Sequence, residues 1–183
     1  MARRDRRVRA ARVDYPAYGH ARRIQSGGHE DLVFASAHFI TLSGHRCEAL
    51  HGHNYRAGAV VEGGLELESW FVLDFVALKR VMKRLTDELD HRVLLPRDNP
   101  KLTIAADGDT VRVAFDGRPR YVFPTRDCVI LPIPNTTVEM LAQYLTGRVR
   151  TELAQGGAMH LKAIEIEVEE NFGQSASYRE TLD

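Results

Sequence analysis

The sequence predicts an α+β domain, and two kinds of hydrophobic periodicity carry this prediction. Alternation of hydrophobic and polar residues predicts strands, whereas hydrophobic residues three or four positions apart predict amphipathic helices. The chain has 183 residues, a length that favours one domain over two. The predicted order is strand, strand, helix, a β-rich insertion, helix and strand.

Three segments alternate as strands do: residues 32–40, 51–62 and 161–169. In the first strand Phe34, Ser36 and His38 share one face, because successive side chains of a strand point to opposite sides. The last segment alternates strictly, which predicts a strand with one buried face.

Two helices are predicted at residues 75–89 and 137–154. Hydrophobic residues line one face of the first helix, and lysine, arginine and acidic residues fill the other. Thr136, with Glu139 three residues later, fits a capping box at the start of the second helix. Gly156 and Gly157 end that helix.

The segment between the helices, at about 97–130, differs in composition from the rest of the chain. Short β-prone runs are separated there by the turn-forming pairs Asp107-Gly108 and Asp116-Gly117. An Asp-Gly pair between such runs is a hairpin signal. We therefore expect an inserted β-hairpin or small meander.

Residues 1–28 are predicted to be a basic, disordered tail, which leaves residues 29–183 as the domain. The first 23 residues carry eight arginines against Asp5 and Asp14. Because the formal net charge is zero, the remaining chain is acidic, which argues against a nucleic-acid partner. No apolar run is long enough for a membrane span, and the tail lacks the apolar core of a secretory signal. With two cysteines and no export signal, we expect a cytoplasmic protein.

Histidines on two of the predicted strands point to a metal site. His51 and His53 project from one face of their strand, and His38 lies on the preceding strand. If the two strands pair as antiparallel neighbours, the three imidazoles reach one point. Three neutral imidazoles leave a fourth tetrahedral position open, as in catalytic zinc sites. His45 and Cys47 lie close enough in sequence to compete as ligands.

A series of motifs surrounds these histidines in the chain. They are residues 34–38 (Phe-Ala-Ser-Ala-His), Cys47 with residues 51–55 (His-Gly-His-Asn-Tyr), residues 70–75 (Trp-Phe-Val-Leu-Asp-Phe), residues 89–91 (Leu-Asp-His), residues 135–139 (Asn-Thr-Thr-Val-Glu) and residues 168–178. In this order they resemble the 6-pyruvoyl-tetrahydropterin synthase and 6-carboxytetrahydropterin synthase family. The resemblance covers roughly residues 30–95 and 130–180.

The resemblance implies the T-fold (tunnelling fold), an antiparallel four-stranded sheet with two helices. It also implies a homo-oligomer, commonly a hexamer of two trimers, with active sites between subunits. The insertion at about 97–130 departs from the compact members of the family. It could reshape the mouth of the pocket or the oligomer.

The resemblance further implies a pterin triphosphate substrate, 7,8-dihydroneopterin triphosphate, and a zinc ion bound by His38, His51 and His53. Cys47 and His91 would transfer protons, since a thiol beside a cation or metal loses its proton more readily. Asp90 would orient His91.

The resemblance also implies that the pterin is bound by a glutamate. Glu170 would accept two hydrogen bonds from pterin N–H groups, with Glu169 as the competing assignment. Glu139 either contacts the pterin as well or serves only the capping box.

The reaction outcome divides the family. Cys47 lies four residues before His51, a spacing that resembles the branch forming 6-carboxy-5,6,7,8-tetrahydropterin for queuosine-type 7-deazapurines. The alternative is triphosphate elimination to 6-pyruvoyl-tetrahydropterin. Some members of the family carry a glutamate near this position in place of the cysteine, and they resemble enzymes that form 6-hydroxymethyl-dihydropterin. Glu48 matches that glutamate, so a second activity through Glu48 is a further hypothesis. Outside the family, the site would fit a zinc-stabilised scaffold with Cys47 as fourth ligand, or a zinc hydrolase.

Overall fold

The central feature of the computed structural model is a curved, mixed β-sheet; the described residues are 20–24 and 32–182. Six strands lie in the order β10-β6-β2-β5-β11-β12, and β1 pairs with β5 as a further strand. The strands of this sheet are β1 (His20–Ile24), β2 (Val33–His38), β5 (His51–Gly63), β6 (Arg92–Pro96), β10 (Cys128–Leu131), β11 (Leu161–Asn171) and β12 (Gln174–Thr181).

The implied four-stranded, antiparallel sheet is therefore wrong in two respects. The sheet is wider, and β6 pairs in parallel with both β2 and β10. These two strands extend the sheet beyond β2: Arg92–Pro96 precedes the insertion, and Cys128–Leu131 lies at its end. They are short apolar runs without alternation, so periodicity does not mark them as strands.

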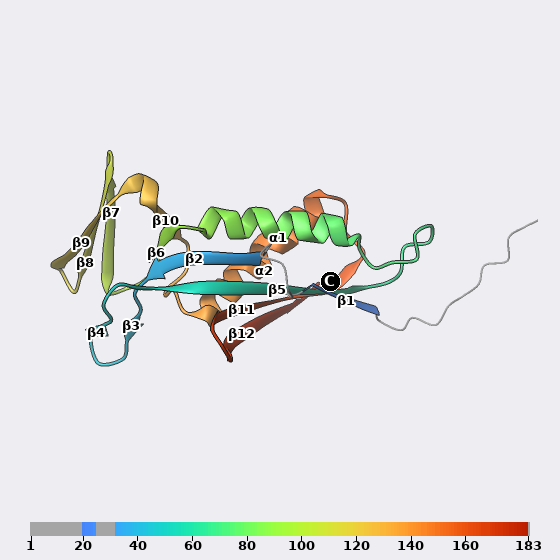
Figure 1. Ribbon diagram of the computed structural model, residues 1–183, viewed down its shortest axis with the longest axis horizontal. Coiled ribbons are helices and arrows are strands. Elements are labelled where there is room, and N and C mark those ends of the chain that lie inside the picture. The colour runs from blue at the N-terminus through green and yellow to red at the C-terminus, as the bar shows by residue number, and fades with distance from the viewer. Residues whose placement is uncertain (1–19, 25–31, 183) are drawn as a thin grey trace, which may run out of the picture.

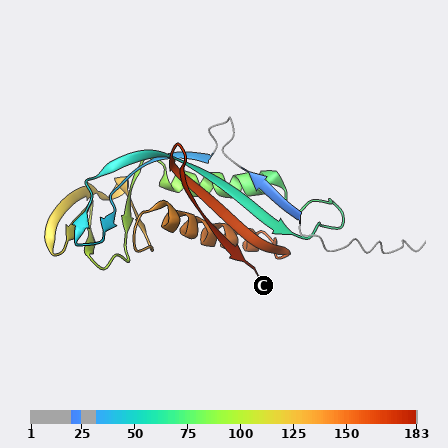
Figure 2. The same ribbon diagram turned by 90° about the horizontal axis from the view of Figure 1, so that it is seen from below.

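Helices α1 (Phe75–Leu89) and α2 (Val138–Gln155) lie side by side on one face of the sheet (Figure 1). The turned view in Figure 2 shows how the sheet curves beneath them. The larger hydrophobic core fills the space between helices and sheet, as Leu78, Leu141 and Ile166 illustrate. Among the described residues, no helix is long and apolar enough to cross a membrane.

The predicted capping box at the start of α2 is wrong. Thr137 is the N-cap residue and makes no side-chain capping bond. Thr136 is fully buried, and its hydroxyl donates a hydrogen bond to the carbonyl of Phe39 at 3.1 Å. Glu139 is exposed in the first turn of α2. The motif correctly marks the start of the helix, but the Thr136 hydroxyl bonds the carbonyl of Phe39 and does not cap the helix.

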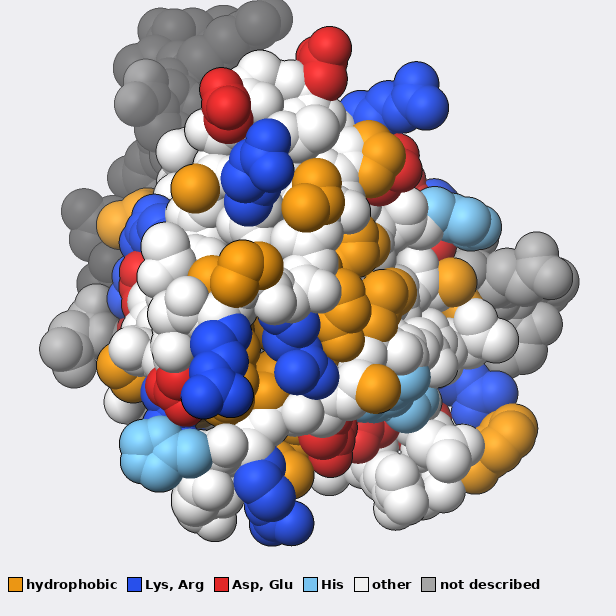
Figure 3. Space-filling view, turned by 90° about the vertical axis from the view of Figure 1, so that its left-hand side faces the viewer, with side chains coloured by type: hydrophobic (Ala, Val, Ile, Leu, Met, Phe, Trp, Pro, Cys, Tyr) orange, Lys and Arg blue, Asp and Glu red, His pale blue; other side chains and the backbone are white. Residues whose placement is uncertain are grey.

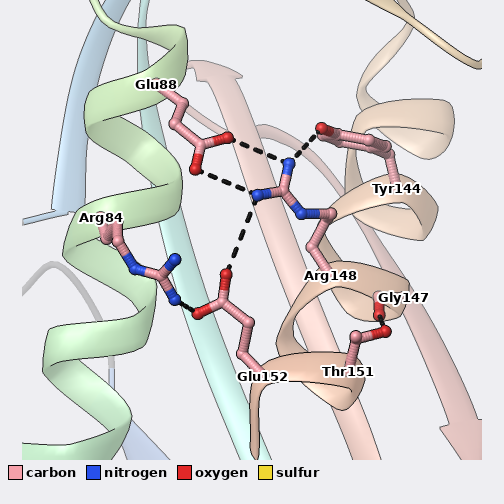
Figure 4. Close-up of polar contacts among 7 residues, drawn as sticks. All are labelled: Arg84, Glu88, Tyr144, Gly147, Arg148, Thr151 and Glu152. Atoms are coloured by element: carbon pink, nitrogen blue, oxygen red, sulfur yellow. Dashed lines mark hydrogen bonds and ion pairs between the residues drawn. The ribbon is translucent and has the colours of Figure 1, made fainter. Parts of the chain in front are cut away.

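Ion pairs join the outer surfaces of the two helices (Figure 4). Arg148 of α2 contacts Glu88 of α1 at 3.0 Å and also donates to the hydroxyl of Tyr144. Glu152 of α2 pairs with Arg84 of α1. The network therefore links the helices where they face away from the sheet.

Two smaller sheets lie at one end of the molecule (Figure 1). Strands β7 (Leu102–Asp107), β8 (Thr110–Phe115) and β9 (Arg118–Pro124) form an antiparallel three-stranded meander, as predicted for the insertion. It continues into a short 3-10 helix, Thr125–Asp127. Strands β3 (Thr41–Leu42) and β4 (Arg46–Cys47) form a short hairpin before β5. In the view onto this end, hydrophobic side chains run across the middle of the surface beside lysine and arginine side chains (Figure 3).

A second, smaller core fixes the meander to the domain. Phe39, Leu95, Val111 and Val113 are all buried there, and Tyr121 packs against them. Because Phe39 lies next to β2 and Leu95 lies in β6, this core joins the meander to the edge of the main sheet.

The range predicted as a tail contains one described strand. Residues 20–24 form β1, which pairs antiparallel with the end of β5. The rest of the predicted tail lies outside the described residues.

Candidate metal centre and active site

Strand register brings His38, His51 and His53 together. Strands β2 and β5 are antiparallel neighbours, and His38 of β2 stands directly opposite His51 of β5. One ligand-capable atom from each of the three residues lies within 4.8 Å of the others. The convergence predicted from strand spacing is therefore confirmed.

Backbone hydrogen bonds fix which ring nitrogens face the centre of the cluster. Nδ1 of His38 lies 2.9 Å from the carbonyl oxygen of Thr136, and Nδ1 of His51 lies 2.9 Å from that of Ala49. A carbonyl only accepts, so each Nδ1 carries the proton in its neutral ring. Each Nε2 is then a lone-pair donor, and the two Nε2 atoms are 3.1 Å apart.

Two lone pairs at that distance repel unless a cation lies between them. Tetrahedral zinc with Zn–N bonds of about 2.0–2.1 Å places neighbouring ligand nitrogens roughly 3.3 Å apart. The observed separation of 3.1 Å is close to that spacing. Backbone carbonyls that orient ligating histidines are also usual around zinc. The residues present fit a zinc ion.

His38 is the buried member of the cluster, with an exposed fraction of 2%. Burial lowers the pKa of His38 from 6.5 to about 4; the Thr136 carbonyl opposes this shift, and nearby His51 and His53 add to it. The ring is therefore neutral at physiological pH, the form that binds metal.

Gly52 lies between His51 and His53, and its lack of a side chain allows β2 to approach β5 closely at this point. A Cβ atom at Gly52 would meet the carbonyl oxygen of Ser36 at 3.2 Å. That contact is tighter than ordinary van der Waals separation, so a side chain here would disturb the strand pairing that aligns His38 with His51.

Cys47 and Glu48 lie in the segment immediately before β5, and both are partly buried. Burial raises the pKa of the Cys47 thiol, the positive charge of Arg120 opposes this, and Glu48 and Asp116 add to it. The backbone N–H of Glu48 donates to the carbonyl of Ile40 at 3.0 Å. The segment is thereby tied to the end of β2.

Asp90 and His91 form a pair at the end of α1. The Asp90 carboxylate lies 2.8 Å from Nδ1 of His91 and also accepts a 2.8 Å hydrogen bond from the backbone N–H of Ala35. Burial raises the pKa of Asp90, but the bonds from Ala35 and His91 outweigh it, so the pKa is lowered overall. His91 adopts a left-handed backbone with φ 56°.

Within the described residues, His91 and Cys47 do not line the same pocket. His91 is exposed and lines a pocket of about 510 Å³ together with Gly52, His53 and Asn54. Cys47 instead packs against the smaller core. A single chain thus presents the proposed thiol and the Asp90–His91 pair on separate surfaces.

Glu169 and Glu170 have different surroundings at the end of β11. Both line a pocket of about 440 Å³ that also includes His53. Glu169 contacts Arg56 at 3.4 Å and accepts a hydrogen bond from Gly173. Burial raises the pKa of the Tyr55 hydroxyl, and the negative charge of Glu170 adds to this shift.

Sequence reasoning missed three residues of this region. Tyr55 is fully buried and its hydroxyl has no hydrogen-bond partner among the described residues. The spacing of His51, His53 and Tyr55 could have placed Tyr55 on the histidine face. Arg120 and Tyr121 of β9 contact the Cys47 segment, and no local pattern signals a contact between residues more than 70 positions apart.

The chain is similar in fold and sequence to proteins named for pterin-converting enzymes. The fold matches a structure of Plasmodium vivax 6-pyruvoyltetrahydropterin synthase, a variant in which a catalytic glutamate is replaced by alanine, with a TM-score of 0.82 and 26% identity over 90% of this chain and 99% of that chain. The chain is 33% identical to a putative 6-carboxy-5,6,7,8-tetrahydropterin synthase of Methanocaldococcus jannaschii, over 86% of this chain and 96% of the relative. It is 30% identical to a protein of the same name in Pyrococcus horikoshii, over 82% of this chain and 87% of the relative.

These likenesses define a T-fold protein with a histidine cluster suited to a metal ion. The family model described as 6-pyruvoyl tetrahydropterin synthase matches residues 29–181. The chain belongs to this family.

Proposed function

We propose that the protein is a zinc-dependent pterin lyase that converts 7,8-dihydroneopterin triphosphate to 6-carboxy-5,6,7,8-tetrahydropterin. The observation that carries the proposal is the pair of Nε2 atoms of His38 and His51, 3.1 Å apart with both Nδ1 atoms committed to backbone carbonyls. In a member of a pterin-converting family, such a site calls for a bound cation.

In this proposal His38, His51 and His53 hold the zinc ion. When bound, zinc supplies a Lewis acid that stabilises negative charge developing on a side-chain oxygen of the substrate. The remaining work belongs to groups that bind the pterin and move protons.

Glu170 is proposed to bind the pterin ring. Its carboxylate can accept two N–H hydrogen bonds from a pterin, and it lies beside the pocket that His53 lines. Glu169 is the weaker candidate because Arg56 and Gly173 already engage its carboxylate. Glu139 is exposed in the first turn of α2, and its contacts among residues 32–182 assign it no role beyond its place near the helix N-terminus.

Cys47 and His91 are proposed to transfer protons, with Asp90 orienting the His91 ring through the 2.8 Å contact to Nδ1. Because these groups lie on separate surfaces of one chain, we propose that the site is completed between subunits of a homo-oligomer. The exposed edge strand β12 leaves backbone groups that a second copy can pair. A hexamer is the assembly we expect.

The carboxy-forming reaction is favoured by the names of the relatives from Methanocaldococcus jannaschii and Pyrococcus horikoshii and by the spacing of Cys47 from His51. Triphosphate elimination to 6-pyruvoyl-tetrahydropterin is the second candidate, because the matched Plasmodium vivax structure carries that name. The catalytic glutamate of that protein also supports a role for Glu48, which is partly buried beside Cys47. Glu48 would then act in forming 6-hydroxymethyl-dihydropterin.

Product identification tests these candidates. The zinc-loaded protein is incubated with 7,8-dihydroneopterin triphosphate, and the products are separated and weighed by mass spectrometry. We expect 6-carboxy-5,6,7,8-tetrahydropterin as the main product, lost in Cys47→Ala. A second activity requires that Glu48→Ala selectively lose the hydroxymethyl product. A protein that releases no pterin product of any kind would overturn the proposed function.

The matched pair Glu170→Gln and Glu169→Gln tests the pterin contact. Removing the charge of a carboxylate that binds two N–H groups should weaken substrate binding by about 10- to 100-fold at Glu170 and only slightly at Glu169. Titration of both variants with substrate measures the difference. The reverse order would move the contact to Glu169.

A further inference from the structure

Side chains of β9 hold the backbone of the segment that carries Cys47 and Glu48. Nη2 of Arg120 donates to two successive carbonyl oxygens, that of Cys47 at 3.1 Å and that of Glu48 at 2.7 Å. The neighbouring Tyr121 accepts a 3.0 Å hydrogen bond at its hydroxyl from the backbone N–H of Leu50. Three hydrogen bonds from β9 thus reach the chain just before His51.

The direction of the two carbonyls explains why a cation is needed there. Successive carbonyls of an extended strand point to opposite sides, whereas those of Cys47 and Glu48 converge on one nitrogen. Parallel carbonyl dipoles repel, and a charged donor between them offsets that repulsion. Arg120 therefore stabilises a local conformation that the segment would not favour alone.

Residues in and just before the meander also contact the first half of the loop formed by residues 41–50. Asn99, which precedes the meander, donates to the Thr41 hydroxyl at 2.8 Å, and Lys101 donates to the carbonyl of Leu42 at 3.4 Å. Asp116, in the turn between β8 and β9, lies 3.4 Å from the ring of His45. Residues 41–50 are therefore contacted along their length by residues 99–121. In Figure 1 this loop, with β3 and β4, lies at the same end of the molecule as the meander.

The Arg120 side chain is built into the protein, since it is partly buried and its guanidinium carbon lies 5.2 Å from the centre of the Tyr121 ring. Tyr121 in turn stacks on Phe123 and contacts Phe39 in the smaller core. The side chains of Arg120 and Tyr121 that contact the Cys47 segment are thus held in place by aromatic packing. A rigid base is what a residue needs to position another group.

We propose that Arg120 and Tyr121 are positioning residues: they fix the Cys47–Leu50 backbone, and through it the thiol and carboxylate, relative to the cluster of His38, His51 and His53. The meander then sets the geometry of proton transfer without contacting the substrate. The catalytic part of this inference rests on the proposed function, whereas its structural part rests on the contacts alone.

Hydrogen exchange followed by mass spectrometry tests the structural part on the full-length, zinc-loaded protein. Arg120→Met removes both charge-assisted bonds and keeps most of the apolar stem. We expect amides of residues 48–52 to exchange about 10- to 100-fold faster, because such bonds contribute roughly that factor to local opening. Arg118→Met, an exposed position on the same strand, is the matched control and should exchange as the wild type.

Steady-state kinetics test the catalytic part. Arg120→Met should lower kcat by about 10- to 100-fold while KM and zinc content stay within about twofold, since misplaced proton donors slow chemistry more than binding. Arg120→Lys should restore part of kcat, because an ammonium can also donate to both carbonyls. Tyr121→Phe removes one hydroxyl and keeps the ring, so it gives a milder version of both effects should Arg120→Met fail to fold.

The outcomes separate the inference from the function on which it rests. Unchanged exchange at residues 48–52 in both Arg120→Met and Tyr121→Phe would overturn the positioning role. Faster exchange across α1 as well, with loss of zinc, would make Arg120 a general stabiliser and also overturn it. Faster local exchange with unchanged kcat would overturn the catalytic part. A wild type that makes no pterin product defeats the proposed function, and the exchange experiment still decides the contacts.

Discussion

The three histidines and the Cys47 segment adjoin one another in the chain, yet different kinds of contact position them. The histidines stand on β2 and β5, whose antiparallel register places His38 opposite His51. The Cys47 segment has only the two-residue strand β4, which pairs with β3, and one backbone bond to Ile40; side chains of β9 add long-range contacts. One half of the candidate site is therefore fixed by long paired strands, and the other by a short hairpin with long-range side-chain contacts.

This difference follows the two hydrophobic cores. The strands that carry the histidines lie on the larger core beneath both helices. Cys47 belongs to the smaller core of the meander, which rests on four buried residues. Four predictions probe the contrast between these regions and the rest of the domain, beginning with the largest expected effect.

Removing His51 and His53 together tests the half that strand pairing fixes. We expect His51→Ala/His53→Ala to lower the metal content from about one zinc ion per chain to near zero, because one imidazole cannot hold the ion alone. Elemental analysis of the purified protein measures this. His45→Ala, an exposed histidine of the loop, is the control and should keep its metal. Full metal in the double variant would refute the ligand assignment.

The same substitution in each core compares their contributions to stability. Leu141 lies in the larger core and Leu95 in the smaller one, and both side chains are fully buried. We expect Leu141→Ala to cost about 3–5 kcal/mol and Leu95→Ala about 2–3 kcal/mol, because a smaller core near the surface relaxes more around a cavity. Urea unfolding gives both values. Equal costs would show that the cores are equally rigid.

The buried ring of His38 makes the metal-free protein sensitive to acid. Its pKa falls from 6.5 to about 4 on folding, so the unfolded chain takes up a proton in this window and the folded chain does not. Stability should therefore decline as the pH drops from about 6.5 to about 4, by up to roughly 3 kcal/mol from this residue. Urea unfolding of wild type and His38→Gln at both pH values isolates the effect. Parallel losses in the two proteins would contradict it.

The smallest effect is expected at the ion pairs between α1 and α2. Arg148 pairs with Glu88 on the outer surface of the helices. Arg148→Met should cost about 1 kcal/mol or less, since exposed ion pairs contribute little. Thermal unfolding combined with Glu88→Gln in a double-mutant cycle measures the coupling. A coupling above about 2 kcal/mol would show that this surface stabilises the domain as much as a core contact.

The fold was predictable where the chain shows strong local periodicity. Helix α1 spans Phe75–Leu89 as predicted, and β2, β5 and β11 lie where alternation placed them. Strands β6 and β10 were missed because each is short and shows no alternation, and their parallel pairing joins segments far apart in the chain. The sequence interpretation also did not recognise β12 as a strand of its own, distinct from β11, after the turn at Gly173.

The same limit applies to the candidate site. Spacing placed His51 and His53 on one face, and the assumption that the two strands pair brought His38 near them. The contacts of Arg120 and Tyr121 depend on how the meander folds back over the loop, and no pattern in either segment encodes that path. The capping box failed for a related reason, because Thr136 finds a buried partner in Phe39 that lies outside its own helix.

The contacts of Arg120 and Tyr121 with the Cys47 segment also bear on how such an enzyme can change over evolution. They end on main-chain atoms: the carbonyls of Cys47 and Glu48 and the N–H of Leu50. Main-chain atoms are the same whatever side chain a residue bears. A mutation that changes the side chain of residue 47 or 48 therefore leaves these main-chain acceptors and donors in place. Under the proposed function, proteins that share the support could therefore change reaction outcome by single substitutions at these positions, without first having to rebuild the loop.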